Sequence, residues 1–447
     1  MDEFFNKLKR PFNGTWDAVE SDMSVFEYIM IRLPVKSILM FKSISKHWYN
    51  VTSTKIFMQL HYHWSKKNAK FFAFHDPNDQ ENNEYCEMHL MEPNGVYIES
   101  YSINPVFKTL EDINLIASFN GLICLMNDAT LHEMAYNMDL RICNPATNEV
   151  LLLPRSHMSQ DKPIFGVLYS NKSHIYKIFK FFSDDPKIGY SRCEVYFSKT
   201  GQWKLATGVP THTLMQPTRS WLSNSNGVCV NEKLYWFSAD GYEDGIDYSA
   251  SVLMVDMEEN FRLIPLPTYP ETAFLIELCG RLCFVEWLGV KFCLWLYNET
   301  NDGWYLLNIV IFPFKGMEIA HFDSVVTHKD EILFVYRDLE YLRHEVMYDV
   351  RGATWAYFPI AEDDEEKKVV VFPYFETFLS CHLQEGRLVL MHVLLVVEWR
   401  QIGGSGDGKA LVPQLQLFHA FMFYLYNTAK KANVHSDLRS SSAVRRG

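Results

Sequence analysis

The chain has 447 residues, of which 48% are hydrophobic and 15% aromatic, so it can bury a substantial core. Its net charge of −12 argues against a nucleic-acid binder that works by neutralising phosphates. The nine cysteines are scattered and form no C-x-x-C pair, which argues against a zinc ribbon or a dithiol site and favours buried free thiols in a reducing compartment.

Residues 1–20 are expected to be an N-terminal tail. Acids at Asp2 and Glu3, and no long apolar core, distinguish this stretch from a secretory signal. The longest apolar runs, residues 388–397 and 415–426, are too short or too polar to span a bilayer of about 30 Å. We therefore expect a soluble protein of the cytoplasm, the nucleus or both, without a membrane partner.

Residues 24–51 predict three short amphipathic helices. Ser24 and Glu27 have the spacing of a capping box, and Pro34 can end the first helix and begin the second. Three helices of this size cannot bury their apolar faces among themselves, so part of that surface should meet a partner. The apolar faces comprise Phe26, Ile29, Met30 and Leu33, then Val35, Ile38 and Leu39, then Phe41, Ile44, Trp48 and Val51.

The run from Arg32 to Ile38, RLPVKSI, with Trp48 ten residues later, is a specific pattern. It resembles the F-box, the adaptor-binding module of SCF-type ubiquitin ligases, here over residues 21–66. The family usually opens with Leu-Pro; Ser21 and Asp22 stand there instead, which puts the first part of the adaptor contact in doubt. A helical hairpin that caps the next domain is the alternative. The adaptor-binding residues that the resemblance implies are Phe26, Ile29, Leu33, Pro34, Val35, Ile38, Leu39, Ile44 and Trp48.

From about residue 70 the pattern becomes strand-like and repeats. An apolar strand, a polar turn and an anchoring apolar residue recur at intervals of roughly 50 residues, with a second strand pair between them. Two hairpins per unit of this length are typical of a propeller blade. The anchoring residues are Val96, Val150, Trp203, Phe261, Trp304 and Trp355.

We therefore expect an all-β propeller of six or seven four-stranded blades over residues 68–398, with the anchoring residues largely buried against neighbouring blades. Residues 372–397 either complete the first blade or begin a seventh. Two packed sheets with irregular loops are the alternative, although regular spacing does not follow from them. Residues 399–447 read as a glycine-rich linker and polar tail without an assigned role.

The segments Phe119-Asn120-Gly121-Leu122 and Cys143-Asn144-Pro145-Ala146-Thr147 carry a second resemblance. In order and spacing they are similar to the F-box-associated domain of plant F-box proteins, over roughly residues 70–380. The glycine pair of true kelch repeats is missing, so the repeats are kelch-like.

Together the two resemblances imply the substrate-recognition subunit of an SCF-type ubiquitin ligase. The F-box would bind a Skp-family adaptor and, through it, the cullin and RING subunits, while the propeller would bind a protein substrate. We find no catalytic constellation and no cofactor motif, and His61 and His63 lack a third metal ligand and are expected at the surface. The alternatives are a scaffold with a degenerate F-box and a propeller enzyme.

Substrate contacts are expected in the longest insertions between predicted strands, because loops vary freely on a rigid frame. These insertions are residues 76–84, 127–139, 210–226 and 238–249. The residues in them that suit protein recognition are Tyr136, His212, Trp221 and Tyr242.

Overall fold

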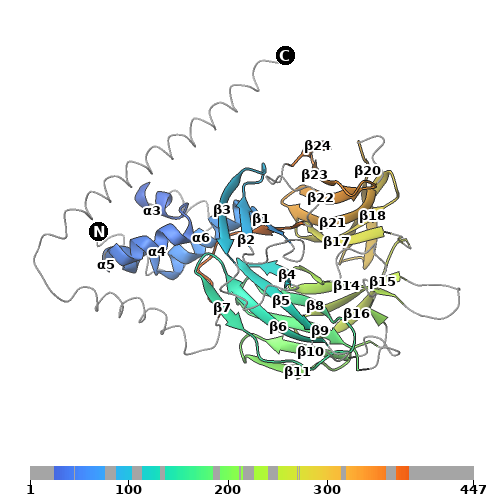
Figure 1. Ribbon diagram of the computed structural model, residues 1–447, viewed down its shortest axis with the longest axis horizontal. Helices are drawn as coiled ribbons and strands as arrows, with labels where there is room; N and C mark the ends of the chain where they lie inside the picture. The colour runs from blue at the N-terminus through green and yellow to red at the C-terminus, as the bar shows by residue number, and fades with distance from the viewer. Residues whose placement is uncertain are drawn as a thin grey trace, which may run out of the picture. The chain divides into compact units, whose positions relative to one another are not determined.

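The computed structural model describes most of the chain between residues 25 and 381. The described ranges are 25–44, 46–75, 87–102, 113–130, 136–184, 192–210, 213–214, 226–239, 250–268, 270, 272–313, 319–358 and 369–381. Helices lead into a ring of strands (Figure 1).

Within the described ranges the helical module has four helices, so the prediction of three is not confirmed. They are α3 (Val25–Met30), α4 (Val35–Ile44), α5 (Lys46–Thr52) and α6 (Lys55–Lys67). Phe41, expected in the third helix, continues α4. The extra helix, α6, begins after Thr54, whose side chain accepts a hydrogen bond from the Phe57 N–H and so caps the helix.

The strands form six sheets, which we number as blades 1 to 6. Each is given from its inner to its outer strand. Blade 1 is β25 (Val369–Tyr374), β1 (Lys70–His75), β2 (Glu87–Met91) and β3 (Tyr97–Ser102); blade 2 is β4 (Ile113–Phe119), β5 (Leu122–Thr130), β6 (Tyr136–Asn144) and β7 (Glu149–Leu152). Blade 3 is β8 (Ile164–Tyr169), β9 (Tyr176–Phe182), β10 (Arg192–Phe197) and β11 (Gln202–Leu205).

In blade 4 two short strands, β12 (Thr213–Leu214) and β13 (Val228–Val230), share the inner position. They pair with β14 (Lys233–Ala239), which is followed by β15 (Ala250–Asp256) and β16 (Phe261–Pro265). Blade 5 is β17 (Thr272–Leu278), β18 (Arg281–Trp287), β19 (Lys291–Asn298) and β20 (Gly303–Ile311). Blade 6 is β21 (Ile319–His328), β22 (Glu331–Asp338), β23 (Arg343–Asp349) and β24 (Thr354–Tyr357).

The six sheets close into a propeller. Their inner strands contact one another in the order β25, β4, β8, β13, β17, β21 and back to β25. The closing strand, β25, pairs antiparallel with β1 from Lys70 opposite Tyr374 to His75 opposite Val369. The propeller prediction is therefore confirmed with six blades, and residues 369–374 complete the first blade rather than begin a seventh.

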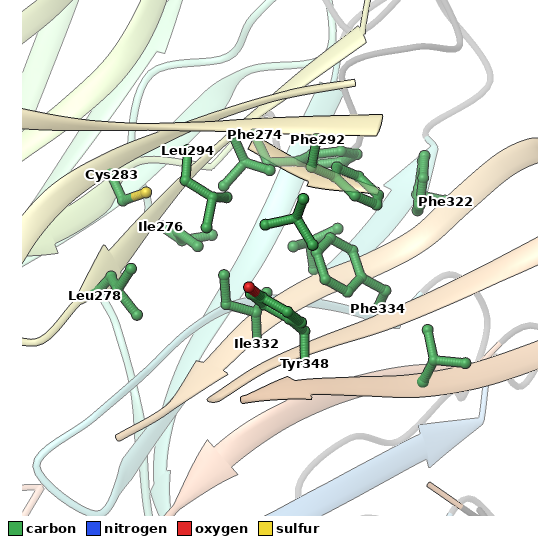
Figure 2. Packing of buried hydrophobic residues seen from close by; sticks show 14 of the residues in the cluster. Phe274, Ile276, Leu278, Cys283, Phe292, Leu294, Phe322, Ile332, Phe334 and Tyr348 are labelled. Atoms are coloured by element: carbon green, nitrogen blue, oxygen red, sulfur yellow. The ribbon is translucent and has the colours of Figure 1, made fainter. Parts of the chain in front are cut away.

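The hydrophobic core is divided into clusters between neighbouring blades. Figure 2 shows the cluster between blades 5 and 6, where the rings of Phe292 and Phe334 lie 4.4 Å apart. The cysteines in the described ranges are all free, and most are buried, as expected; Cys279 is the exposed exception. Each blade thus buries its faces against its neighbours.

The connections between strands lie in two groups at opposite ends of the strands. Asn120 and Gly121, which join the first two strands of blade 2, have φ of 51° and 77°, as tight hairpin turns require. We call the ring face with these turns the helix face, because α6 leads into β1 at this end of the strands. Connections between the second and third strands of each blade leave from the opposite face, the loop face.

Five of the six predicted anchoring residues lie in the first two positions of outermost strands, and Val96 comes directly before β3. Two of them link neighbouring blades by hydrogen bonds: the Trp203 indole N–H donates to the Pro154 carbonyl oxygen, and the Trp304 indole N–H donates to that of Pro265, both at 2.8 Å. Burial is less complete than predicted, since the tryptophans are half-buried and Val96 is 57% exposed. In these two cases a proline at or just after the end of an outermost strand accepts a hydrogen bond from the next blade.

Replacing Trp304 by Phe should lower the free energy of unfolding by about 1 kcal/mol more than replacing Trp295 by Phe. Both variants lose the same volume, but Trp304 loses its bond to Pro265, whereas the buried Trp295 indole N–H has no hydrogen-bond partner among the described residues. Urea unfolding of both variants measures the difference. Equal losses would show that the inter-blade hydrogen bond adds nothing to stability.

Candidate functional site

The structure divides the predicted adaptor-binding residues between the surface and the interior. Ile29 and Leu39 are exposed, whereas Val35 and Ile38 are completely buried within the protein. Pro34 is exposed, and Leu33 and Trp48 are half-buried. The side chains of Phe26 and Ile44 lie outside the described part of the chain.

The helices also expose large apolar residues that the sequence analysis missed. We call the whole set the apolar helix surface: Tyr28, Ile29, Leu39, Met40 and Tyr49, with exposed fractions between 37% and 52%. Tyr28, Met40 and Tyr49 lie outside the predicted helical period, whereas Ile29 and Leu39 belong to it and are exposed as well. Large apolar residues outside the helical period were the sequence signal that could have identified these three exposed residues.

Arg32 of the RLP motif holds α3 against α6. Its guanidinium carbon lies 3.1 Å from the centroid of the Tyr28 ring and 4.4 Å from that of Trp64. A cation between two aromatic faces is attracted by both rings. Arg32 thus fixes one residue of the apolar helix surface, Tyr28, relative to α6.

A segment that follows the closing strand joins the propeller to the helices; we call residues 375–381 the strap. The first N–H of α4, that of Val35, donates to Glu376 Oε2 at 2.5 Å. A carboxylate suits a helix N-terminus, where free N–H groups and the helix dipole favour negative charge. Burial raises the pKa of Glu376, and the bond from Val35 opposes that rise. Glu376 therefore ties the orientation of α4 to the propeller.

The strap crosses the helix face of blade 2 at close range. Thr377 Oγ1 donates to the Asn120 carbonyl oxygen at 3.0 Å, and the Asn144 side chain donates to the Thr377 carbonyl oxygen, also at 3.0 Å. A Cβ atom at Gly121 would lie 2.5 Å from Thr377 Oγ1, so only glycine admits the strap here. The Asn-Gly and Cys-Asn-Pro motifs of the sequence thus form the seat of the strap.

Helix α6 contacts the strap and two blades. The Tyr62 hydroxyl donates to Asn120 Oδ1 at 2.8 Å and lies 3.1 Å from Asn171 Oδ1, and its ring meets Phe375 edge-on. The neighbouring His61 packs on Phe378, with ring centroids 5.0 Å apart. The helices are therefore packed against the helix face, not tethered by a linker alone.

The sequence of this chain was compared with those of known protein families. Residues 57–376 match the F-box associated beta propeller domain. The chain belongs to this family. The match covers the six blades and their closing strand, and confirms the resemblance to the F-box-associated domain of plant F-box proteins.

Curated relatives of this F-box-associated propeller include F-box proteins of Arabidopsis thaliana. One, named an F-box protein, is 24% identical over 357 residues, covering 73% of this chain and 90% of its own length. Another, provisionally named F-box only protein 15, is 24% identical over 217 residues, or 47% of this chain, and the chain spans about half (51%) of its length.

The chain was also compared with solved structures. Dipeptidyl peptidase 4 of Porphyromonas gingivalis aligns with a TM-score of 0.35 and 12% identity, over 64% of this chain and 46% of its own. At this TM-score the similarity supports no conclusion about activity.

The predicted substrate-binding residues lie at or beyond the limits of the described ranges. Tyr136 begins β6, but its side chain is not described, and His212, Trp221 and Tyr242 lie outside the described residues. The strand ends nearest the four insertions point toward the loop face, but two insertions are shorter than predicted, because residues 127–130 and 136–139 belong to β5 and β6 and β12 lies within residues 210–226. The insertions therefore start and end away from the helix face.

Within the described ranges, no group of three His, Cys, Asp or Glu side chains is placed to share a metal ion. Nor is any helix described there long and apolar enough to cross a membrane. His61, expected at the surface, is instead 1% exposed, and its Nε2–H donates to the Leu33 carbonyl oxygen at 3.0 Å. It cannot remain there and serve as a surface ligand.

Stability should fall as the pH drops from about 6.5 to about 4, in part because of His61. Burial lowers the pKa of His61 from 6.5 to about 4, so the unfolded chain binds this proton first. The contribution of neutral His61 to the free energy of unfolding is fully present above pH 6.5. It decreases progressively toward pH 4, by about 3 kcal/mol. The His61→Gln variant keeps a side-chain donor but does not titrate, so its unfolding free energy should lack this fall.

The matched control is His63→Gln on the exposed side of the same helix. Chemical unfolding at several pH values would compare the three proteins. A wild type and a His61→Gln variant with the same pH dependence would contradict the prediction.

Proposed function

We propose that this chain is the substrate-recognition subunit of an SCF-type ubiquitin ligase. The observation that carries the proposal is the apolar helix surface, which lies on a module with an F-box-like sequence attached to an F-box-associated propeller. The named relatives are F-box proteins, which agrees with this role. The module would bind a Skp-family adaptor and, through it, the cullin and RING subunits.

The packing of the helices on the propeller supports recruitment as the mechanism. The apolar helix surface belongs to helices fixed at the helix face, whereas the predicted substrate insertions connect strand ends at the loop face. A substrate bound by Tyr136, His212, Trp221, Tyr242 and their neighbours would not compete with the adaptor. Holding it near the ligase raises the effective concentration of its lysines.

In this role the chain needs no catalytic side chain of its own, so we propose that it is a non-catalytic receptor. It would act in the cytoplasm, the nucleus or both, where the buried free cysteines would stay reduced.

The test is reconstitution of the full chain with a Skp-family adaptor, cullin and RING subunits. A stable complex on size exclusion, and ubiquitin transfer to proteins bound by the chain, are expected. A folded chain that does not bind the adaptor would contradict the proposal. It would favour a scaffold with a degenerate F-box, the alternative that Ser21 and Asp22 at the usual Leu-Pro position leave open.

A further inference from the structure

The outermost strand of blade 5 differs from its counterparts in length. β20 has nine residues, whereas β7, β11 and β24 have four each, β16 has five and β3 has six. It pairs with β19 on one side, and no strand of the described part pairs with its other edge. β20 therefore offers the longest free row of backbone N–H and C=O groups on the rim of the ring.

This edge is apolar as well as long. We define the β20 strip as Leu306, Leu307, Ile309 and Ile311 with Leu288 and Val290 of the adjoining turn, all of them exposed. Ile311 and Val290 are the most exposed, at 73% and 70%, and the Phe312 N–H donates to the Val290 carbonyl oxygen at 3.1 Å. A gathering of exposed large aliphatic side chains on a free strand edge is typical of an association site.

The strip also lacks two of the features that protect exposed strand edges from association, charge and proline, although the register between β20 and β19 is irregular at Leu307. Such edges are usually short, charged or broken by proline. β20 has neither charge nor proline in its nine residues. The other outer strands carry Glu99 in β3, Glu149 in β7, Lys204 in β11 and Pro265 in β16, and β24 is short.

We propose that the free edge of β20 binds an extended, apolar segment of a substrate protein, added as a fifth strand of blade 5. This inference rests on the proposed function and names its mode of recognition. Main-chain hydrogen bonds would supply affinity, and alternate side chains would cover the strip. Because β20 has no charged residue, we expect the part of the bound segment that pairs with it to be uncharged as well.

The surrounding charge defines the segment further. Lys291 lies directly across from Ile311, so an acidic residue at this end of the bound segment would be favoured. A second copy of the chain fits less well, because each copy carries a net charge of −12 and the two would repel.

The position of the strip in the ring suits a substrate. Blade 5 lies opposite blade 2 in the order of inner strands, and the described contacts of the helices are with blades 1 to 3 and the strap. The Ile311 end of β20 also lies at the loop face, where the predicted substrate insertions begin and end. A segment bound there leaves the apolar helix surface free for the adaptor.

The experiment titrates the full chain into a fluorescein-labelled nine-residue peptide of alternating Val and Thr with blocked ends, followed by fluorescence anisotropy. A second peptide adds a terminal Asp, and a third has central prolines that prevent strand pairing. The test variant is Ile309→Gln with Ile311→Gln. The matched control is Leu152→Gln with Tyr357→Gln, which changes exposed apolar residues on two other outer strands.

The expected result is binding of the first peptide, tighter binding of the Asp peptide, and no binding of the proline peptide. The test variant should lose about tenfold in affinity and the control less than twofold, with unchanged thermal unfolding. Peptide binding should also slow hydrogen exchange of the β20 amides. Equal binding by wild type and test variant, or binding of the proline peptide, would overturn the proposal.

Two further measurements separate the alternatives. Sedimentation velocity that shows a dimer lost in the test variant would assign the edge to a second copy and overturn the proposal. Adaptor binding should be the same for the wild type, the test variant and the control. If none of the three proteins bound the adaptor, the proposed ligase role would be refuted. The peptide titration would still test whether the edge of β20 binds an extended segment.

Discussion

Replacing Ile29, Leu39 and Met40 together by Ala is expected to lower affinity for a Skp-family adaptor by about tenfold to hundredfold, or about 1–3 kcal/mol. These side chains are exposed on α3 and α4, so they are available as anchors without a change in the fold. Isothermal titration of the purified chain with the adaptor measures the loss.

The control for this variant replaces Met158, Leu205 and Leu339 by Ala. These residues are equally apolar and exposed, but they lie on the propeller. A folded triple variant of the helices that binds the adaptor as tightly as the wild type would contradict the prediction. Ile38→Ala is a poorer test, because Ile38 is buried and its truncation should cost about 2–4 kcal/mol of stability by itself.

Ending the chain after Phe358 should unfold the whole propeller, whereas ending it after Cys381 should leave a cooperative thermal transition. The shorter chain lacks β25, which pairs along the full length of β1 and buries four large apolar side chains. Each buried side chain of this kind contributes about 1.5–3 kcal/mol, and their sum approaches the about 5–15 kcal/mol stability of a typical domain. The residues concerned are Val369, Val371, Phe372 and Tyr374.

Circular dichroism during heating compares the two truncated chains with the full protein. The shorter chain also loses Glu376 and with it the bond to the Val35 N–H. A soluble 1–358 chain with a transition at the wild-type temperature would show that the ring does not depend on its closing strand. The Val371→Asp variant of the full chain offers a second test, since it should destabilise the same strand without removing the strap.

The sequence by itself determined the repeat. Trp203 and Trp304 stand at equivalent places in blades 3 and 5, where each indole N–H donates to a Pro carbonyl oxygen of the preceding blade. Each hairpin, made of a strand, a tight turn and the next strand, is encoded within a short stretch of sequence. Fold class, blade length and the family motifs around Asn120 and Asn144 could therefore be predicted.

The way in which the ring closes could not be predicted from the sequence. β25 pairs with β1 about 300 residues away in sequence, and an apolar strand matches many edges equally well on pattern alone. The number of blades was decided when Val369 to Tyr374 took the inner position of blade 1. For the same reason no sequence signal showed that Glu376, 341 residues from Val35, would hold the start of α4.

The candidate adaptor surface divides in the same way. Helical spacing placed Val35, Ile38 and Leu39 on one apolar helix face. In the folded protein Val35 and Ile38 are buried and Leu39 is exposed. An amphipathic pattern gives the width of an apolar face, but burial depends on which neighbour covers it. Here the neighbours of the helices include the strap, which follows the closing strand β25 and is more than 300 residues away in sequence.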